Sequence, residues 1–399
     1  MKDIDGVFNF FYDETNNARV FRITEEGKFN TSIFDDFVLG GIVYDSSSSI
    51  SFDQFRESLQ LQSSVREIKR KNIAKGDTFL KCISSNKLEN FLNGLLKGGV
   101  YIHYCMVDSL YFSLADIIDS IIDGQKNNIH TTLSDALNSV IQNRNHNRLS
   151  NLPEFYISGI NWFTYQTVDG FVREVKSVLH KYFRKDINNT SLILKKYGYP
   201  DIHKKDVLYF CSELINWIDR INAESSSDAI AIEIIKVLLQ NAKKGKLVFL
   251  QDNVKDTCIG DYSVFYIYSV YTFINSYHVF DTEKEIYSRI KDLPFHACGK
   301  EMNNYEFKDS TSDIRIQISD VLMGLLGKLS AYANTSSKKQ LILDTVAMTE
   351  QQKTNIKLLK DLILKSSNKN RAFIHYVKNP YDGDKINIIL GIDKGLLIR

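Results

Sequence analysis

The sequence predicts an α/β protein in which a mixed β-sheet is flanked by helices. Short, densely apolar runs at 8–12, 37–44 and 100–107 have the aromatic and β-branched content of buried strands. Before the last of these runs, the apolar residues of 88–96 recur with the period of an amphipathic helix. Of the 399 residues, 43% are apolar and 25% are charged, which is the usual composition of a globular protein with a substantial core.

The N-terminal part of the chain predicts three strands joined by short turns, as in an antiparallel meander. The run 8–12 passes into two acids, Asp13 and Glu14, and then into a polar turn. A second strand is expected at 18–23. The third run, 37–44, is apolar almost throughout, which is typical of a strand that is covered on both faces.

Helices are predicted after these strands, and a further strand follows them. Ser51 or Asp53 is suited to cap the first helix. A helix over 87–97 ends at a Gly-Gly pair, which is a common helix stop signal. The strand over 100–107 again ends in an acid, Asp108. A buried strand that stops at a carboxylate therefore occurs twice in this part of the chain.

The remainder of the chain predicts a helical insertion, a return to the core and an extension. A short apolar run at 247–250 indicates a further strand, which also ends near an acid, Asp252. The helix predicted over 314–327 is largely apolar and contains one acid, Asp320. We expect a core formed by 1–122 and 242–332, a mostly helical insertion at 123–241, and a small α+β C-terminal extension at 333–399 with strands at 372–377 and 386–391.

Composition and the lack of targeting signals predict a soluble cytoplasmic protein. The net charge is only +2, so charge alone does not indicate a nucleic-acid partner. The first residues lack the layout of a signal peptide. The longest apolar run, 264–274, is shorter than the ~20 residues that span a membrane, so no membrane partner is expected. The five scattered cysteines, which form no CxxC motif, are expected to be free thiols in a reducing compartment; they are Cys82, Cys105, Cys211, Cys258 and Cys298.

Several acids occupy positions where carboxylates are unusual. Asp13, Asp108 and Asp252 end predicted strands, Asp320 lies within an apolar helix, and Glu67 is a further candidate. Each of these acids alone is more often a turn or helix-cap residue. If the strands are parallel neighbours, however, the carboxylates converge, and clustered carboxylates repel one another unless a cation lies among them. Such oxygen ligands suit Mg²⁺ or Mn²⁺, and two such ions can activate water for phosphodiester cleavage.

Short motifs in the chain resemble those of the DUF 3800 family and follow in the same order. The most specific lies in 307–324, where Phe-Lys-Asp-Ser and then Gln-Ile-Ser-Asp-Val-Leu-Met-Gly are similar to the family's FxDS and Q(L/I)ADLIAG patterns. Thr15 and Asn16 stand where the first family motif has Ser and Gly, and Ser319 replaces an Ala. The other similar segments are Tyr12-Asp13-Glu14-Thr15-Asn16, Phe37-Val38-Leu39-Gly40-Gly41-Ile42-Val43, Glu67-Ile68-Lys69 and Phe249-Leu250-Gln251-Asp252.

Membership of this family implies a fold like that of ribonuclease H. Such a fold has a mixed sheet, helices on both faces, and acids on the first strand, a later central strand and the closing helix. Family members are widely regarded as nucleases and often lie near mobile-element or phage-defence genes, so a role in antiviral defence is expected. Carried over residue by residue, the resemblance implies the catalytic residues Asp13, Glu67, Asp252 and Asp320, the metal ligands Asp13, Asp252 and Asp320, and the reserve residues Glu14, Asp108 and Gln317.

The leading hypothesis is a Mg²⁺- or Mn²⁺-dependent nuclease in which the acids hold the ions and basic residues contact phosphate. The alternative is a catalytically silent ribonuclease H-like module that acts through a protein partner or a second copy of itself. The nuclease hypothesis requires that the acids lie close together in the fold, whereas the module hypothesis does not. Another kind of hydrolase finds little support, because the sequence has no GxSxG, HExxH or P-loop motif. The basic residues assigned to nucleic acid are Lys69, Arg70, Lys71, Lys195 and Lys196.

Overall fold

The computed structural model describes residues 5–123, 129–146, 149–151, 168–242, 247–293, 295–297 and 299–392. These residues form two compact units, each with buried apolar side chains of its own. Unit 1 contains the described residues of Met1–Arg19, Phe34–Asp108 and Asp261–Arg399, and unit 2 contains those of Val20–Ile33 and Ser109–Gly260.

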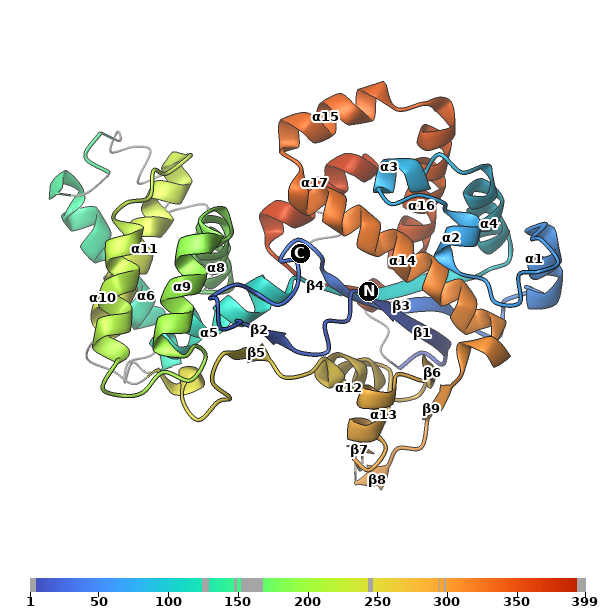
Figure 1. The fold of residues 1–399 in the computed structure, drawn as a ribbon, viewed down its shortest axis with the longest axis horizontal. Helices are drawn as coiled ribbons and strands as arrows, with labels where there is room; N and C mark the ends of the chain where they lie inside the picture. The colour runs from blue at the N-terminus through green and yellow to red at the C-terminus, as the bar shows by residue number, and fades with distance from the viewer. Residues whose placement is uncertain are drawn as a thin grey trace. The chain divides into compact units, whose positions relative to one another are not determined.

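Unit 1 is built on a six-stranded mixed sheet (Figure 1). In sheet order the strands are β10 (Ile374–Val377), β4 (Tyr101–Val107), β3 (Phe37–Tyr44), β1 (Asn9–Thr15), β6 (Tyr277–Asp281) and β9 (Tyr305–Lys308). β3 is antiparallel to both of its neighbours, and every other pair of neighbouring strands is parallel. The predicted α/β class with a mixed sheet is therefore confirmed.

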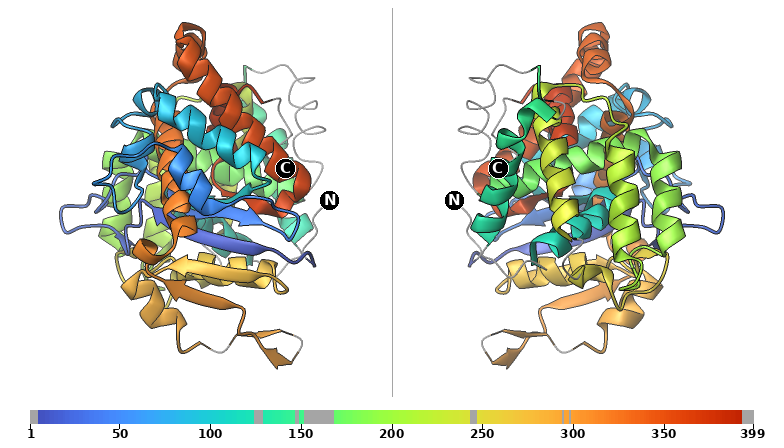
Figure 2. Two further views of the ribbon diagram at one scale, coloured as in Figure 1. Left: turned by 90° about the vertical axis from the view of Figure 1, so that its right-hand side faces the viewer. Right: turned by 90° about the vertical axis from the view of Figure 1, so that its left-hand side faces the viewer.

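Alternating residues of the central strand face two different cores. In β1, Phe11 belongs to the aliphatic core beneath helix α14 (Ile314–Thr335), whereas Phe10 packs against Phe273 on the opposite face. Helix α12 (Ser263–Thr272) covers that second face. In Figure 2 the orange α14 and the gold α12 lie on either side of the blue central strands. The first strand is thus buried on both sides, as its aromatic content requires.

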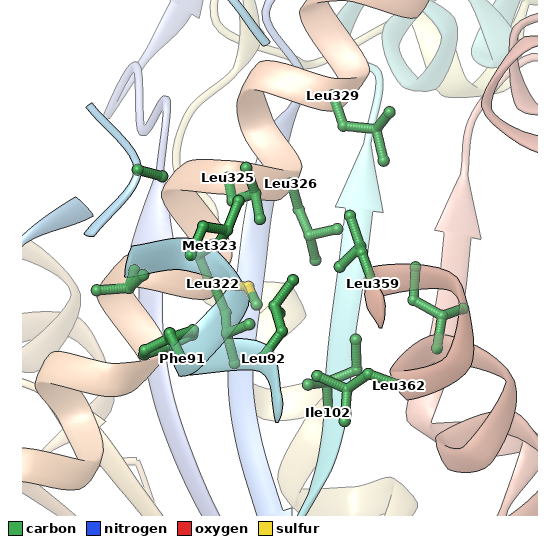
Figure 3. Packing of buried hydrophobic residues seen from close by; sticks show 14 of the residues in the cluster. Phe91, Leu92, Ile102, Leu322, Met323, Leu325, Leu326, Leu329, Leu359 and Leu362 are labelled. Atoms are coloured by element: carbon green, nitrogen blue, oxygen red, sulfur yellow. The ribbon is translucent and has the colours of Figure 1, made fainter. Parts of the chain in front are cut away.

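The larger core is filled by aliphatic side chains from the sheet and from several helices (Figure 3). Leu326 of α14 and Leu362 belong to the same buried cluster as Ile102 of β4. Burying one such side chain contributes ~1.5–3 kcal/mol, so this cluster is a main source of stability in the unit. Helices α4 (Asn86–Lys97), α16 (Glu350–Lys369) and α17 (Pro380–Leu390) contribute to it together with α14 and several shorter helices.

The other described elements of unit 1 lie around this frame. Of the two predicted caps, Ser51 is the residue that accepts a hydrogen bond from the first turn, from the N–H of Gln54 at 3.4 Å. These elements are α1 (Phe52–Ser58), α2 (Arg70–Ile73), α3 (Phe79–Cys82), α13 (Lys284–Ile290), α15 (Lys338–Ala347), the 3₁₀ helices η3 (Ser310–Ser312) and η4 (Arg371–Phe373), and the strands β7 (His296–Ala297) and β8 (Lys300–Glu301).

A glycine in β3 allows α14 to approach the sheet closely. A Cβ atom at Gly41 would lie 2.1 Å from Ser319 Oγ and 2.2 Å from the carbonyl oxygen of Phe11, so no larger residue fits without a shift. The Ser319 hydroxyl proton is shared between that carbonyl, at 3.0 Å, and the carbonyl oxygen of Arg315, at 2.9 Å, and the hydroxyl oxygen accepts a hydrogen bond from the N–H of Ile42 at 3.2 Å. These bonds dock α14 onto the centre of the sheet and fix the position of the next residue, Asp320.

The C-terminal segment contributes directly to the sheet of unit 1. β10 pairs in parallel with β4, with Ile374 opposite Tyr104. Just beyond β10, the buried ammonium group of Lys378 forms an ion pair with the buried Asp36 and donates a hydrogen bond to Asn334 Oδ1 at 2.7 Å. This polar network joins the end of β10 to α14 and to the segment before β3.

The strand predicted over 386–391 is wrong, because this segment is helical. The side chain of Asn379 caps α17 by accepting a hydrogen bond from the N–H of Tyr381 at 3.0 Å. Pro380 occupies the first turn, where its missing N–H costs nothing. Gly391 ends the helix with a left-handed φ of 61°. These start and stop signals outweigh the strand-like isoleucine content of the segment.

Unit 2 is mostly helical, and a short antiparallel ribbon accompanies the helices. In the ribbon, Phe21 lies opposite Ile259. The described elements are β2 (Phe21–Arg22), α5 (Ser109–Asp123), α6 (Ile129–Gln142), η1 (Arg144–His146), α8 (Val168–Lys185), α9 (Ile187–Tyr197), α10 (Val207–Ile218), α11 (Ser226–Ala242), η2 (Val248–Leu250) and β5 (Thr257–Ile259).

The strand predicted over 247–250 is also wrong. The segment forms the 3₁₀ helix η2, and the N–H of Phe249 donates a hydrogen bond to Ser120 Oγ of α5 at 3.0 Å. Asp252 follows in a left-handed turn with φ of 61°, a conformation that aspartate tolerates. Four apolar residues are too few to distinguish a strand from a single helical turn, which explains the error.

The four cysteines in the described part of the chain are free thiols. Cys82, Cys105 and Cys211 are buried, and Cys258 is partly buried. Among the described helices, none combines the length and the apolar character that crossing a membrane requires.

Candidate carboxylate site

Asp13 lies near the carboxyl end of β1, in the middle of the sheet. Its partner on the adjacent strand β3 is Gly40, and Asp13 as a whole residue is 7% exposed. One carboxylate oxygen accepts a hydrogen bond from the N–H of Glu14 at 2.7 Å. Burial raises the pKa of Asp13 well above its usual range, and the charges of Glu14, Asp320 and Asp281 raise this pKa further. Asp13 is therefore the buried centre of a group of acids.

Asp281 occupies the corresponding position on the adjacent parallel strand. Tyr12 of β1 pairs with Phe280 of β6, so Asp13 and Asp281 follow side by side at the same edge of the sheet. Asp281 Oδ1 accepts hydrogen bonds from the N–H groups of Thr282 at 2.9 Å and Ser310 at 3.0 Å. Burial raises the pKa of Asp281, although these bonds oppose the rise. Asp281 is not among the acids predicted from the sequence.

Asp320 reaches the group from helix α14. Asp320 Oδ2 accepts a hydrogen bond from the backbone N–H of Arg70 at 3.2 Å, at the start of α2. Burial raises the pKa of Asp320, and the positive charge of Lys69 partly counteracts this rise. The predicted acid in an apolar helix thus has a partner, and it lies where its charge acts on Asp13.

Glu67 belongs to an irregular segment that α14 and η3 hold in place. Glu67 Oε1 accepts hydrogen bonds from Ser310 Oγ at 2.8 Å and from Lys69 Nζ at 2.6 Å. Gln317 accepts a hydrogen bond from the N–H of Ile68 at 2.9 Å and donates one to the carbonyl oxygen of Ser310 at 2.7 Å. Burial alone would raise the pKa of Glu67, but the hydrogen bonds from Lys69 and Ser310 lower this pKa overall. Gln317, a reserve residue in the sequence analysis, is the clamp of this segment.

Lys69 brings a positive charge into the group of acids. Burial lowers the pKa of its ammonium group, but the hydrogen bond to Glu67 and the charges of Asp320 and Asp13 raise this pKa overall. The side chain is 38% exposed. Lys69 is therefore partly open to solvent and also electrostatically part of the site.

Glu14 points to the opposite face of the sheet, toward α12. Burial raises the pKa of Glu14 to about 7, and the charge of Asp281 contributes to the rise. The buried hydroxyl of Tyr266 opposes this rise but does not reach hydrogen-bond geometry with any described group. Glu14 is thus beside the site and not on the face that Asp320 occupies.

Asp252 and Asp108 do not occupy the predicted positions on strands beside β1. Asp252 follows η2 and belongs to unit 2, whereas Asp13 and Asp320 belong to unit 1. The strand-end position that the prediction gave to Asp252 is filled by Asp281. Asp108 does follow a strand of unit 1, but β3 separates that strand, β4, from β1. Its N–H donates a hydrogen bond to the carbonyl oxygen of Val377.

The predicted nucleic-acid residues differ in how far the fold engages them. The Arg70 guanidinium donates hydrogen bonds to the carbonyl oxygens of Ala74 and Gly76, both at 2.9 Å, so it supports the local fold. Lys71 is exposed in unit 1. In unit 2 the two lysines meet acids: Lys195 pairs with Asp256 at 2.9 Å and with Glu25 at 3.3 Å, and Lys196 pairs with Glu213 at 2.5 Å.

The group of acids provides carboxylate oxygens, which hard cations bind, and it brings several negative charges into one region. Among the described residues, no three oxygens from Asp13, Asp281, Asp320 and Glu67 all lie within 4.8 Å of one another. Burial and repulsion from neighbouring acids raise the pKa values of Asp13 and Asp320, and a divalent cation would relieve the repulsion. Carboxylate oxygens of this kind are the ligands that Mg²⁺ and Mn²⁺ prefer. The oxygens are therefore of the chemical type that such an ion binds, but in the described residues they are not gathered as closely as the ligands of one ion.

Comparisons with known proteins add no relative to this description. No protein-family model, no curated protein and no solved structure matches the chain. The similarity of its short motifs to the DUF 3800 family therefore stays a prediction, and the function has to be inferred from the site itself.

Proposed function

We propose that unit 1 is a divalent-metal-dependent nuclease that cleaves phosphodiester bonds with the Asp13, Asp281 and Asp320 carboxylates. One observation carries this proposal. Three acids from segments far apart in the sequence share one end of the sheet, and the charges of the other two raise the pKa of the buried Asp13. Maintaining such repulsion is costly, and strongly perturbed acids that cluster together are typical of functional sites.

The proposed fold is ribonuclease H-like, as the motif resemblance to the DUF 3800 family implies. That fold is expected to carry acids on its first strand, on a later central strand and on its closing helix. In this chain Asp13 lies on β1, Asp281 ends β6 beside it, and Asp320 lies on α14 across the face of β1 and β3. The strand order and the placement of these acids support the assignment.

Asp13, Asp281 and Asp320 would hold Mg²⁺ or Mn²⁺, and Glu67 would complete the ligand set or orient a water molecule. When bound, such ions supply an activated water and stabilise the leaving oxygen of the phosphodiester. The chain's own residues prepare the site. Ser310 and Thr282 orient Asp281, the N–H of Arg70 orients Asp320, and Gln317 fixes the segment that carries Glu67.

Nucleic acid is the proposed substrate class because a cation-loaded acid site next to basic side chains suits a polyanion. Lys69 lies at the site, and Lys71 is exposed on α2 close by in the sequence. A role in defence against phage or mobile elements follows only from the family resemblance and is part of the same proposal.

The proposal is tested by incubating the full chain with single- and double-stranded DNA and RNA in Mg²⁺ or Mn²⁺. Asp13→Asn and Asp320→Asn should each lower cleavage by at least about 100-fold, since losing one group that stabilises the transition state typically costs 10²–10³ in rate. The matched control is Asp77→Asn, an exposed acid of the same unit, which should cleave like the wild type. Equal cleavage by all four proteins would contradict the site.

A catalytically silent module that works through a protein partner is the second candidate. The exposed face of α15 favours it, because Ile342 and Leu343 are each 54% exposed and Val346 is 77% exposed. Exposed aliphatic side chains that adjoin on one helix are typical of contact surfaces. Wild-type protein that binds neither Mn²⁺ nor nucleic acid, and cleaves none of the four substrates, would favour this function over the nuclease.

A further inference from the structure

We propose that Lys69 is a built-in counter-ion of the acid site, and that nucleic acid promotes metal binding by drawing Lys69 away. In the free protein its ammonium group neutralises part of the acid charge and competes with the divalent ion. When nucleic acid binds, a phosphate group becomes the ion-pair partner of the ammonium group. The carboxylates can then bind the metal ion. This inference rests on the proposed function, since it describes how the same site is loaded.

The backbone around Lys69 is fixed, whereas one ion pair holds the end of its side chain in the part of the chain that the structure describes. The N–H of Ile68 is bound by Gln317, and the N–H of Arg70 is bound by Asp320. The N–H of Lys69 itself donates to Asn72 Oδ1 at 2.9 Å. Its ammonium group forms an ion pair with Glu67 Oε1 at 2.6 Å. The flexible side chain of Lys69 can therefore change its conformation while the backbone stays in place.

The surrounding charges indicate that Lys69 is the cation that has to move away from the acids when a metal ion binds. The hydrogen bond to Glu67 and the charges of Asp320 and Asp13 raise the pKa of its ammonium group, and the charge of Lys69 in turn lowers the pKa of Asp281. The guanidinium of Arg70 is bound to backbone carbonyls and cannot move as freely. Because Lys69 is 38% exposed, its ammonium group can exchange the acid for a phosphate without crossing the core.

The consequence is a reciprocal coupling between two ligands. If nucleic acid strengthens Mn²⁺ binding by some factor, Mn²⁺ must strengthen nucleic-acid binding by the same factor. Couplings of this kind are usually about 5- to 150-fold. Removing the ammonium group should therefore strengthen Mn²⁺ binding to the free protein and, at the same time, abolish the effect of nucleic acid on it.

The test measures free Mn²⁺ by electron paramagnetic resonance during titration of the full chain, with and without cleavage-resistant phosphorothioate 12-mers of DNA or RNA. Lys69→Met keeps the length of the side chain and removes its charge. It should bind Mn²⁺ at least about fivefold more tightly than the wild type and should gain nothing from the 12-mer. Lys69→Arg should behave like the wild type, as should Lys75→Met, which removes an exposed charge nearby.

Asp320→Asn separates the two levels of the proposal. If Asp320→Asn removes Mn²⁺ binding but Lys69→Met and the wild type have the same Mn²⁺ affinity, the counter-ion role is overturned and the metal site stands. If the wild type and Lys69→Met show no Mn²⁺ binding that depends on Asp320, both the site and the role of Lys69 are overturned. Thermal melts of each variant, compared with the wild type, identify any that fail to fold.

Discussion

The hydroxyl of Ser319 donates a hydrogen bond to the carbonyl oxygen of Phe11 at 3.0 Å and so joins helix α14 to the central strand. Asp320 follows Ser319, and Asp13 lies two residues beyond Phe11. Asp13 and Asp320 are 307 residues apart along the chain, and this bond fixes how the segments that carry them are placed. Geometry at the site depends on packing at this contact.

The contact at Gly41 is the first place where the account can be tested. Gly41→Ala would put a methyl group 2.1 Å from Ser319 Oγ, so we expect a loss of about 1–3 kcal/mol or more in the free energy of unfolding. Urea unfolding measures this loss. Gly260→Ala is the control, because its added Cβ would meet no atom within 4 Å, and it should change stability by less than about 0.5 kcal/mol. Similar stabilities of the two variants would argue against close docking of α14.

Stability should depend on pH through Glu14. Its pKa is raised from 4.5 to about 7 in the folded protein, so the folded state binds more protons than the unfolded state between these values. This group's contribution is complete below about pH 4.5 and is lost as the pH rises through about 7. Urea unfolding of Glu14→Gln from pH 5 to 8 should lack this fall in stability. A wild type and variant with parallel pH profiles would contradict the burial of Glu14.

Addition of Mn²⁺ should raise the melting temperature, and the shift should grow as the pH rises. Burial and mutual repulsion raise the pKa values of Asp13 and Asp320, and a metal binds only their ionised forms. Saturation at 100 times the dissociation constant would add about 2.7 kcal/mol to the free energy of unfolding. Differential scanning calorimetry with Mn²⁺, and then with EDTA, gives the effect. Asp13→Asn should show little of it, and a shift as large in Asp13→Asn as in the wild type would place the metal elsewhere.

The ion pair between Lys378 and Asp36 should hold the C-terminal segment in place. Both residues are buried, so Lys378→Met would leave Asp36 without its counter-charge at a cost of about 3–5 kcal/mol. The double variant Lys378→Met with Asp36→Asn should recover part of the loss, because it removes both charges. Denaturant unfolding of the single and double variants tests this. Additive losses in the double variant would mean that the two residues do not act as a pair.

The sequence was informative where a long pattern agreed with a local signal. The strands 9–15, 37–44 and 101–107 had dense apolar content and clear ends, and the structure has them. Asp13 and Asp320 could be chosen because an acid at a buried strand end or in an apolar helix is unusual. Their proximity, however, depends on docking through Gly41 and Ser319, which no local pattern contains.

The strand expected at 247–250 was predicted wrongly for a physical reason. Two short apolar runs are followed by an acid or end in one, namely Leu247–Leu250 and Tyr277–Asp281. Their length alone does not show which of them forms the strand beside β1. Asp281 carries a signal that resembles that of Asp13, since aromatic and β-branched residues lead directly into the carboxylate. Choosing between the runs required the sheet pairing of β1 with β6, a contact between residues more than 260 positions apart.

The central claim is that Asp13, Asp281 and Asp320 form one catalytic site, and the exchange of Asp252 for Asp281 tests it most directly. Nuclease activity of Asp281→Asn and Asp252→Asn should be measured side by side with Mn²⁺ on the substrate that the wild type cleaves. We predict that Asp281→Asn loses at least about 100-fold of the activity, because it removes a charged group of the site. Asp252→Asn should stay within about twofold of the wild type, as expected for a substitution away from the site. Retained activity in Asp281→Asn together with its loss in Asp252→Asn would contradict the account.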